Sequence, residues 1–180
     1  MRTVTGPRVE LRPWRATDED FLFDLESRWE TVRYLGPAAR PMVSRSEARA
    51  SIARRRALRH PIHGIWLIVD RATQHPLGNL LLKPVRLSSG VAGPAPVEVG
   101  WHLHPDAQGA GYATEAAVTI LDDAATRGLK HVIAVVDPRN EASRRVCRRI
   151  GMVQGPTSEA YYDECSQVFN LDLPREPAAL

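Results

Sequence analysis

The sequence predicts an α/β fold, in which helices flank one mixed sheet that contains antiparallel hairpins. Three observations support this prediction. Several short segments alternate apolar and polar residues, as strands do. Other segments repeat apolar residues at helical spacing. The expected order along the chain is β-α-α-β-β-β-α-β-α-β, which is typical of a sheet that combines hairpins with crossover helices.

The first third of the chain is expected to hold one strand and two helices, over 8–15, 18–28 and 44–60. Pro13 should end the strand, because it has no backbone N–H to donate. Thr17 is a suitable N-cap for the first helix. Ser44, followed three residues later by Glu47, matches a capping box at the start of the second.

The middle of the chain is expected to hold three strands, over 64–70, 79–87 and 97–104. The first two should form a hairpin, and Pro84 suggests an edge position or a bulge for the second. The Ser-, Gly- and Pro-rich stretch 88–96 reads as a loop.

The most regular helical pattern lies in the stretch "GYATEAAVTILDDAATRG" (111–128), where Gly128 is a suitable stop. The apolar run 130–137 predicts a strand that is buried on both faces. A short helix capped by Asn140 follows. The last expected strands lie over 166–174, which should close the sheet, and near 152–155 or 159–163.

Length and composition favour one globular domain over residues 1–180, with 43% hydrophobic and 25% charged residues. No run of about 18 apolar residues predicts a membrane span, and the N-terminus lacks the apolar region of a signal peptide. Two cysteines are too few for a disulfide framework, so a cytoplasmic location is expected. The mild net charge of +3 suits an anionic ligand as well as nucleic acid.

The stretch "QGAG" joins an expected strand to an expected helix. Gly109 and Gly111 would let the backbone turn sharply there, and the helix N-terminus offers unpaired N–H groups to an anion. It is not a P-loop, because no lysine follows, and Thr114 stands where a dinucleotide-binding fingerprint needs Gly or Ala. The pattern alone leaves two interpretations open, a phosphate cradle and an ordinary turn.

Four segments, in the right order, resemble the GCN5-related N-acetyltransferase (GNAT) superfamily: "RVELRPWRATDED", "VEVGWHLHPDAQ", "QGAGYA" and "NEASRRVCRRIGM". The first of these is similar to the ribosomal-protein alanine N-acetyltransferase branch of the RimJ/RimL type. The resemblance covers nearly the whole chain. It implies a mostly antiparallel mixed sheet of about six to seven strands, about four flanking helices, and two splayed parallel strands, here 97–104 and 130–137.

The resemblance also implies acetyl-CoA as cosubstrate and no metal. Its diphosphate would lie on the glycine turn, its pantetheine along the strand edge, and its thiol end near the last helix. The residues implied are Gln108, Gly109, Ala110, Gly111, Tyr112, Ala113 and Thr114 for the diphosphate, Trp101 to Leu103 for the pantetheine, and Asn140 and Ser143 for the thiol end.

In this family an amine attacks the thioester directly, which requires a base, a polarised carbonyl and a leaving thiolate. Glu98 is the first candidate base, although it could be an ordinary salt-bridged carboxylate, and His102 is the second. The amide near Leu103 could polarise the carbonyl. Many relatives place a tyrosine where this chain has Cys147, which is expected to be a small core residue.

That departure moves the thiolate role toward Ser143 or water, and Tyr161 and Tyr162 stay without an assigned role. His102 and His104 lack further partners at zinc-ligand spacing, so no metal is expected. Two arginine clusters could be solvated helix faces. Alternatively, Arg144, Arg145 and Arg148 could meet the CoA 3′-phosphate, and Arg54 to Arg56 an acidic partner.

The sequence therefore predicts an N-acetyltransferase for a protein α-amine or a small amine. The alternative is a CoA-binding or nucleic-acid-binding module without turnover, with nucleic acid the less expected ligand. The acceptor pocket should involve 18–28, 44–60, 88–96 and 156–165, and Trp14, Trp29, Tyr34 and Trp66 should be core or pocket wall. A homodimer could form through strand 166–173.

Overall fold

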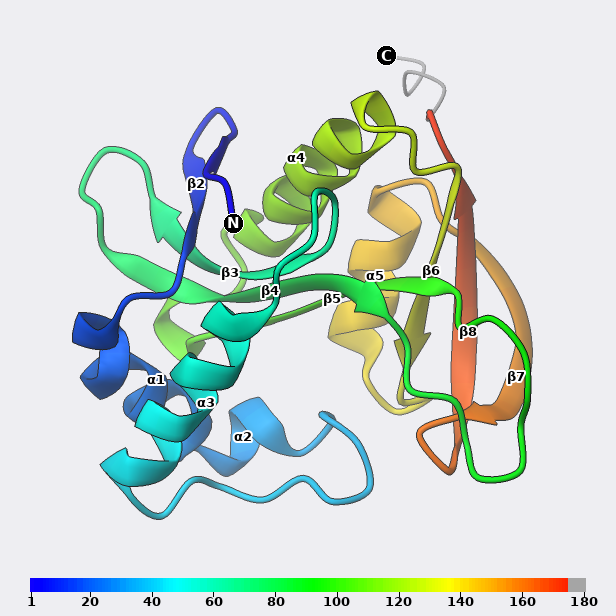
Figure 1. Cartoon of the computed structure of the whole chain (residues 1–180), viewed down its shortest axis with the longest axis horizontal. Coiled ribbons are helices and arrows are strands. Elements are labelled where there is room, and N and C mark those ends of the chain that lie inside the picture. The colour runs from blue at the N-terminus through cyan, green and yellow to red at the C-terminus, as the bar shows by residue number, and fades with distance from the viewer. Residues whose placement is uncertain (175–180) are drawn as a thin grey trace.

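The computed structural model describes residues 1–174. The strands are β1 (Val4–Thr5), β2 (Val9–Pro13), β3 (Gly64–Asp70), β4 (Pro76–Pro84), β5 (Val97–Leu103), β6 (His131–Val136), β7 (Val153–Tyr161) and β8 (Glu164–Asp172). The helices are α1 (Glu19–Glu26), α2 (Trp29–Val32), α3 (Arg45–Ala57), α4 (Tyr112–Thr126) and α5 (Glu141–Arg149). Two 3₁₀ turns span Ala16–Asp18 and Pro105–Ala107 (Figure 1).

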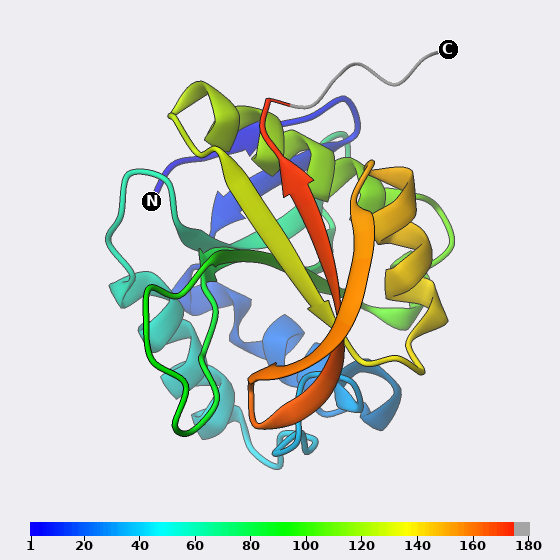
Figure 2. The same ribbon diagram turned by 90° about the vertical axis from the view of Figure 1, so that its right-hand side faces the viewer.

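The eight strands form one sheet in the order β1-β2-β3-β4-β5-β6-β8-β7, and only the β5–β6 pair is parallel. This pair is joined in register at a single position, Glu98 opposite Ile133, near the start of both strands. Figure 2 shows β6 and β8 crossing in front of β5. The mixed α/β sheet with one parallel pair that the sequence predicts is therefore confirmed, and the point where this pair parts lies inside the sheet.

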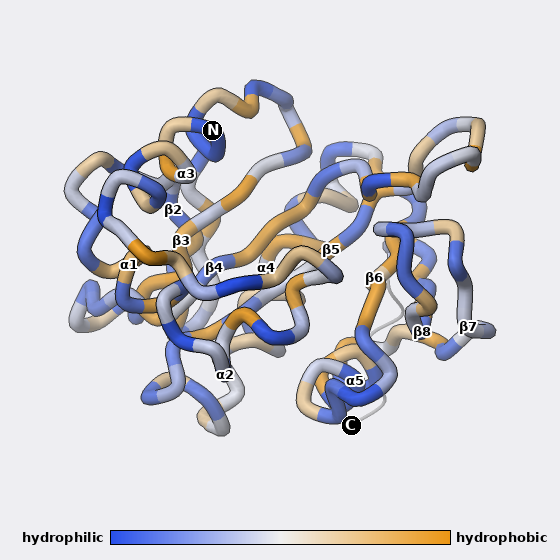
Figure 3. The backbone as a smooth tube through the Cα atoms, turned by 90° about the horizontal axis from the view of Figure 1, so that it is seen from below, coloured by the Kyte–Doolittle hydropathy of each residue, from blue (hydrophilic) through white to orange (hydrophobic). Residues whose placement is uncertain are grey.

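Strand β3 shows why both faces of the sheet are covered. Trp66 and Ile68 belong to the core beneath α4, whereas Leu67 and Val69 belong to a second core beneath α1 and α3. Because successive strand residues point to opposite faces, one continuous apolar run supplies both cores. Figure 1 shows α4 on one side of the sheet and α1 and α3 on the other. In Figure 3, the orange colour that marks hydrophobic residues recurs along the central strands.

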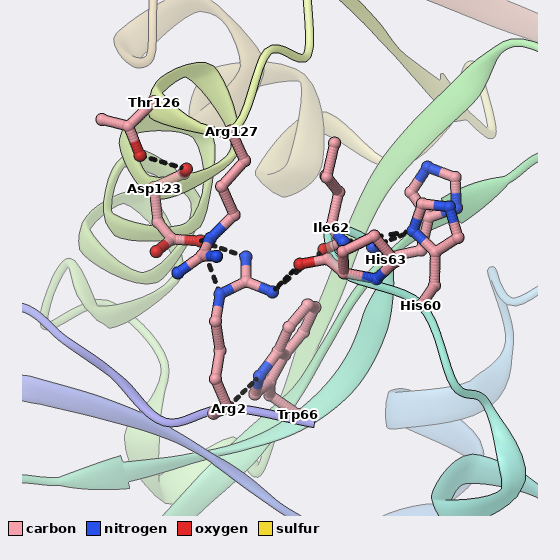
Figure 4. A network of polar contacts seen from close by, with 9 residues as sticks. Arg2, His60, Ile62, His63, Trp66, Asp123, Thr126 and Arg127 are labelled. Atoms are coloured by element: carbon pink, nitrogen blue, oxygen red, sulfur yellow. Dashed lines mark hydrogen bonds and ion pairs between the residues drawn. The ribbon is translucent and has the colours of Figure 1, made fainter.

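The N-terminal residues are tied to α4 and to the loop before β3 (Figure 4). The Arg2 guanidinium donates to Asp123 Oδ2 at 2.7 Å through Nε and to the Pro61 carbonyl at 2.7 Å through Nη1. The Trp66 indole N–H donates to the Arg2 carbonyl at 2.9 Å. These contacts fix β1 and β2 beside α4.

Most helix boundaries follow the sequence signals, with one correction. Ser44 is the N-cap of α3 and accepts from the Glu47 N–H, as predicted, and Gly128 follows the end of α4 with φ +92°. Thr17 is not an N-cap. It lies inside the first 3₁₀ turn, and α1 begins after Asp18, whose carboxylate is occupied by the Arg15 N–H and the Arg12 guanidinium.

The sheet corrects two further expectations. β4 lies between β3 and β5, so Pro84 is not on an edge strand; it ends an interior strand, where its missing N–H costs no ladder hydrogen bond. β8 does not close the sheet, because β7 pairs outside it and joins the two alternatives near 152–155 and 159–163 into one strand. A dimer through strand 166–173 would therefore have no open backbone edge to use. Strand β1 and helix α2 were not predicted.

Candidate active site

Two adjoining cavities open where β5 and β6 separate. Both are lined by Trp101, His102 and Ser143. The first, called the acidic cavity below, is also lined by residues 34–36, 98–100 and 134–137 with Leu81, Tyr162, Glu164 and Ser166. The second, called the glycine-loop cavity, is also lined by Glu30, Thr31, Arg33, Leu103, Gln108, Gly109, Gly111–Thr114, Asn140, Ala142, Arg145, Val146 and Arg149.

The glycine loop has the backbone that an anion cradle needs. Gly109 and Gly111 have φ values of +81° and +86°, which residues with a Cβ rarely adopt. Gly111 is the N-cap of α4, so the first amides of this helix have no intrahelical partner. The Thr114 hydroxyl is buried and has no hydrogen-bond partner among the described residues. This combination of free amides and an orphaned hydroxyl fits a phosphate-bearing ligand.

Arg8 places a cation beside this loop that was not predicted from the sequence. Its Nη1 donates to the Ala110 carbonyl at 3.2 Å, its Nε pairs with Glu115 at 2.8 Å, and its guanidinium lies 5.1 Å from the Tyr112 ring centroid. The contact spans about a hundred positions, and it exists because β2 lies beside the start of α4. Local patterns carry no signal for it.

Nearly all residues predicted for CoA binding line the glycine-loop cavity. The exception is Ala110, whose carbonyl is turned to Arg8. Those that line it are Trp101, Leu103, Gln108, Gly109, Gly111, Tyr112, Ala113, Thr114, Asn140 and Ser143. Asn140 also caps α5, where its Oδ1 accepts from the Ser143 N–H at 3.1 Å.

The arginines at this cavity differ from those predicted. Arg145 lines it, but Arg144 is paired with Glu141 and Arg148 donates to Gln154 at 3.4 Å. The other lining arginines are Arg33, which follows the unpredicted helix α2, and Arg149. The cationic wall therefore comes from both sides of the cavity, and the sequence indicated only one.

The edge of β5 presents amides to the gap between β5 and β6. The His104 N–H donates to the Leu77 carbonyl at 2.9 Å, toward β4. Because amides alternate in direction along a strand, those of Leu103 and Trp101 face the gap. The Leu103 carbonyl accepts from the Gln108 side chain at 3.2 Å, which holds the glycine loop against the strand end.

Glu98 is buried at the wall of the acidic cavity and is held by two partners. The Tyr162 hydroxyl donates to its Oε1, and Lys83 Nζ lies 3.5 Å from the same oxygen. Burial raises the pKa of Glu98 above its ordinary value, while the Tyr162 hydrogen bond and the Lys83 charge act in the opposite direction. The alternative of a salt-bridged carboxylate is thus partly realised, yet the group still lines a cavity.

His102 is paired with a carboxylate from α1. Its Nε2 lies 3.1 Å from Glu26 Oε1, and the same oxygen accepts a hydrogen bond from the Arg55 guanidinium. Burial alone would raise the pKa of Glu26, but the His102 and Arg55 contacts outweigh it and hold this pKa at about 2. If Nε2 donates to Glu26, only Nδ1 is left to accept a proton. His104 pairs separately with Asp24 at 3.0 Å, so the two histidines do not converge.

The position of Arg55 corrects the expectation of a basic surface patch over Arg54 to Arg56. Its guanidinium is buried against Glu26 and lies 4.9 Å from the Trp14 ring centroid. It therefore belongs to the packing beneath the sheet and not to a surface that meets an acidic partner.

The acidic cavity is lined only in part by the segments predicted for an acceptor pocket. Residues 34–36, after α2, line the acidic cavity, whereas 44–60 and 88–96 do not; of the segment 156–165, Tyr162 and Glu164 do. Trp14 and Trp66 are core residues and Tyr34 is cavity wall, as predicted, but Trp29 is 56% exposed. Helix 18–28 contributes only indirectly, through the Glu26 contact to His102.

Cys147 is a core residue, as predicted, and burial raises the pKa of its thiol to about 12. Cys165 is exposed on β8. Because the thiolate is the reactive form, we expect a thiol reagent at pH 8 to modify one cysteine per native chain quickly and both after unfolding. Cys165→Ser should leave the native protein unreactive. Fast modification of that variant would contradict the buried position of Cys147.

If Glu98 is the base that the sequence predicts, Tyr162→Phe should shift the pH dependence of the reaction that Glu98 assists. The phenol O–H stabilises the ionised Glu98, so its removal raises the pKa of Glu98 further. The activity lost on acidification should then be lost at a higher pH than in the unmodified protein. Tyr161→Phe is the matched control, because Tyr161 is the preceding tyrosine, whereas the hydrogen bond to Glu98 comes from Tyr162. Equal pH profiles for the two variants would contradict the role of Tyr162.

Comparisons with known proteins identify the family. Residues 8–153 match the family described as "Acetyltransferase (GNAT) domain". Two proteins of Bacillus subtilis (strain 168) are similar over part of the chain: the uncharacterized N-acetyltransferase YnaD is 38% identical over 69 residues, and the uncharacterized protein YkkB is 33% identical over 89 residues. These alignments span 38% and 49% of the chain, and the same shares of the two relatives.

Solved structures share the fold over nearly the full length. An acetyltransferase from Agrobacterium tumefaciens str. C58 is 26% identical with a TM-score of 0.75, covering 95% of this chain and 94% of that one. Mycobacterium smegmatis RimJ, in complex with a CoA-disulfide, is 20% identical with a TM-score of 0.77, covering 97% and 90%. The match over residues 8–153 decides the family, and it confirms the resemblance seen in the sequence motifs: the chain belongs to the GNAT family of acetyltransferases.

Proposed function

We propose that the protein transfers the acetyl group of acetyl-CoA to a primary amine by direct attack of the amine on the thioester. One observation carries the proposal. The glycine-loop cavity, with its anion cradle, and the acidic cavity, with buried Glu98, meet at the shared residues Trp101, His102 and Ser143. A phosphate-bearing donor on one side and an amine on the other would therefore face each other across β5.

The residues present fit acetyl-CoA as a substrate. The diphosphate would lie on the amides of Gly109, Gly111 and the first turn of α4, with Thr114 and Arg8 as further partners. Arg33, Arg145 and Arg149 would serve the remaining phosphate. Acetyl-CoA supplies the activated acetyl group, and neighbours solved with CoA, such as M. smegmatis RimJ, support this reading of the fold.

The side chains around the shared wall have separable tasks. Glu98 would accept the proton that the acceptor ammonium must lose before its nitrogen can attack, and burial raises the pKa of this carboxylate, which makes it a stronger base. The Leu103 amide, which faces the gap, would donate to the acetyl oxygen. Ser143 would donate to the leaving sulfur, because Cys147 is buried and cannot do so. In total a C–N bond replaces a C–S bond, and the sulfur leaves as a thiol.

Several expectations remain predictions. The acceptor could be a protein α-amine, as the name of the RimL neighbour suggests for that protein, or a small amine. A single domain over 1–180, a cytoplasmic location and a homodimer are likewise predictions. Among residues 1–174, no helix is both long enough and apolar enough to pass through a bilayer.

The test combines calorimetric titration of acetyl-CoA with detection of released CoA thiol over a panel of peptides and small amines. Because Cys165 is exposed, Cys165→Ser should be the protein used for thiol detection. Binding with turnover of at least one amine would support the proposal. Binding without turnover of any amine would favour a CoA-binding module, and no binding would mean that the glycine loop is only a turn.

A further inference from the structure

The wall of the acidic cavity is negatively charged. Glu98, Asp137 and Glu164 line it, and no lysine or arginine within residues 1–174 does. A cavity walled by one sign of charge concentrates the opposite charge. This favours ammonium groups, and it disfavours any acceptor that carries a carboxylate near its reacting nitrogen.

Two of these three carboxylates are already compensated by cations that do not line the cavity. Lys83 Nζ is 3.5 Å from Glu98. Arg139 pairs with Asp137 Oδ2 at 2.7 Å, and its Nε donates to the other oxygen of that carboxylate at 3.0 Å. The nearby Arg86 is likewise engaged, with Asp163 at 3.0 Å.

Within residues 1–174, Glu164 is the carboxylate without a cation in direct contact, and only the charge of Arg139, which pairs with Asp137, acts on it from a longer distance. No hydrogen bond or ion pair in the described part of the chain reaches its side chain. It lies at the start of β8, two residues from Ser166, which also lines the cavity, while Cys165 between them is exposed. Strand alternation therefore turns the Glu164 side chain to the cavity side. The two-residue turn Tyr162–Asp163 separates it from Tyr161, its partner on β7.

Glu164 lines the same cavity as the proposed base, Glu98, and its hydrogen-bond partner Tyr162. Tyr162 donates to Glu98 and lines the same cavity, and Glu164 follows it by two residues. The cavity therefore offers one carboxylate at the proposed reacting end, held by a phenol, and a second carboxylate that makes no hydrogen bond or ion pair with the described residues. A molecule with an ammonium group at each end matches this pattern.

We propose that the acceptor is a short linear diamine, with one nitrogen acetylated beside Glu98 and the other bound as an ammonium by Glu164. This proposal rests on the proposed acetyltransferase function and names its substrate class. Glu164 is a binding residue in this scheme and takes no part in proton transfer.

The test uses three amines with the same four-carbon chain: putrescine, butylamine and 4-aminobutanoate, which end in an ammonium, a methyl and a carboxylate group. Putrescine should have a kcat/KM about 10-fold above that of butylamine, and 4-aminobutanoate should be the poorest substrate. Glu164→Gln should bring the ratio of the putrescine and butylamine kcat/KM values close to one, because only putrescine has a second ammonium for Glu164 to bind. Glu159→Gln removes the same charge from an exposed position on β7 outside the cavity, and it should leave this ratio unchanged.

The outcomes separate this proposal from the function on which it rests. A putrescine-to-butylamine ratio that Glu164→Gln leaves unchanged would overturn the role of Glu164. Turnover of peptides without turnover of putrescine would overturn the substrate class and leave the acetyltransferase function standing. Acetyl-CoA binding without turnover of any amine would overturn both.

Discussion

Glu98→Gln should lower kcat by at least about 100-fold, the lower range for loss of a general base. The amide keeps the size of the carboxylate and its contact with Tyr162, but it cannot take a proton from the attacking amine. The unmodified protein should lose activity as the pH falls through the raised pKa of Glu98, because protonation removes the base. The variant should retain only a weak rate that lacks this acid limb.

A stability measurement distinguishes this effect from unfolding. A carboxyl whose folded pKa is raised binds its proton more tightly in the folded state, so its ionised form weakens folding above that pKa. Glu98→Gln should therefore melt no lower than the unmodified protein at neutral pH. A loss of rate below about threefold, with the acid limb intact, would remove Glu98 as the base and move the role to His102.

The sequence predicted those parts of the fold that depend on local periodicity. Helix α4 and strand β3 lie almost where their apolar spacing places them, because one buried stripe or two buried faces leave a regular pattern. The glycine loop was equally readable, since Gly109 and Gly111 adopt the positive φ values that only glycine takes easily.

What could not be predicted depends on contacts between distant segments. The Tyr162–Glu98 hydrogen bond joins positions 64 residues apart, and the Arg8–Ala110 bond joins positions 102 apart. Helix α2 is a single turn, too short for a periodic signal, yet it leads into Arg33 and Tyr34, which line the two cavities. The edge position predicted for Pro84 was wrong because a proline, which lacks an N–H, loses no ladder hydrogen bond either at the end of a strand or on an edge strand.

Gly111→Glu should weaken acetyl-CoA binding by at least about 100-fold, the effect of losing two charge-assisted hydrogen bonds. The backbone at this position, with φ +86°, would force the new residue into the left-handed conformation, and its Cβ would lie 3.4 Å from Arg8 Nη2. The new carboxylate would occupy the amides of α4 that the diphosphate needs, and it would repel the diphosphate.

Gly128→Glu is the matched control, because it makes the same change, with similar backbone strain at φ +92°, at the opposite end of the same helix. The helix dipole should change the stability of the two variants in opposite directions. A carboxylate at the N-terminus of α4 stabilises the helix by about 0.3–1 kcal/mol, and one at the C-terminus destabilises it by a similar amount. Gly111→Glu should therefore be the more stable variant and the weaker binder.

This reversal of order distinguishes a lost site from a damaged fold, since general damage would weaken binding and stability together. Gly111→Ala, which keeps the strain without the charge, should bind acetyl-CoA with an affinity between those of the glutamate variant and the unmodified protein. Equal affinities for Gly111→Glu and Gly128→Glu by calorimetry would show that the diphosphate does not lie on the amides of α4. The arginines Arg33, Arg145 and Arg149 would then have to hold it, and the glycine loop would be a turn without a ligand.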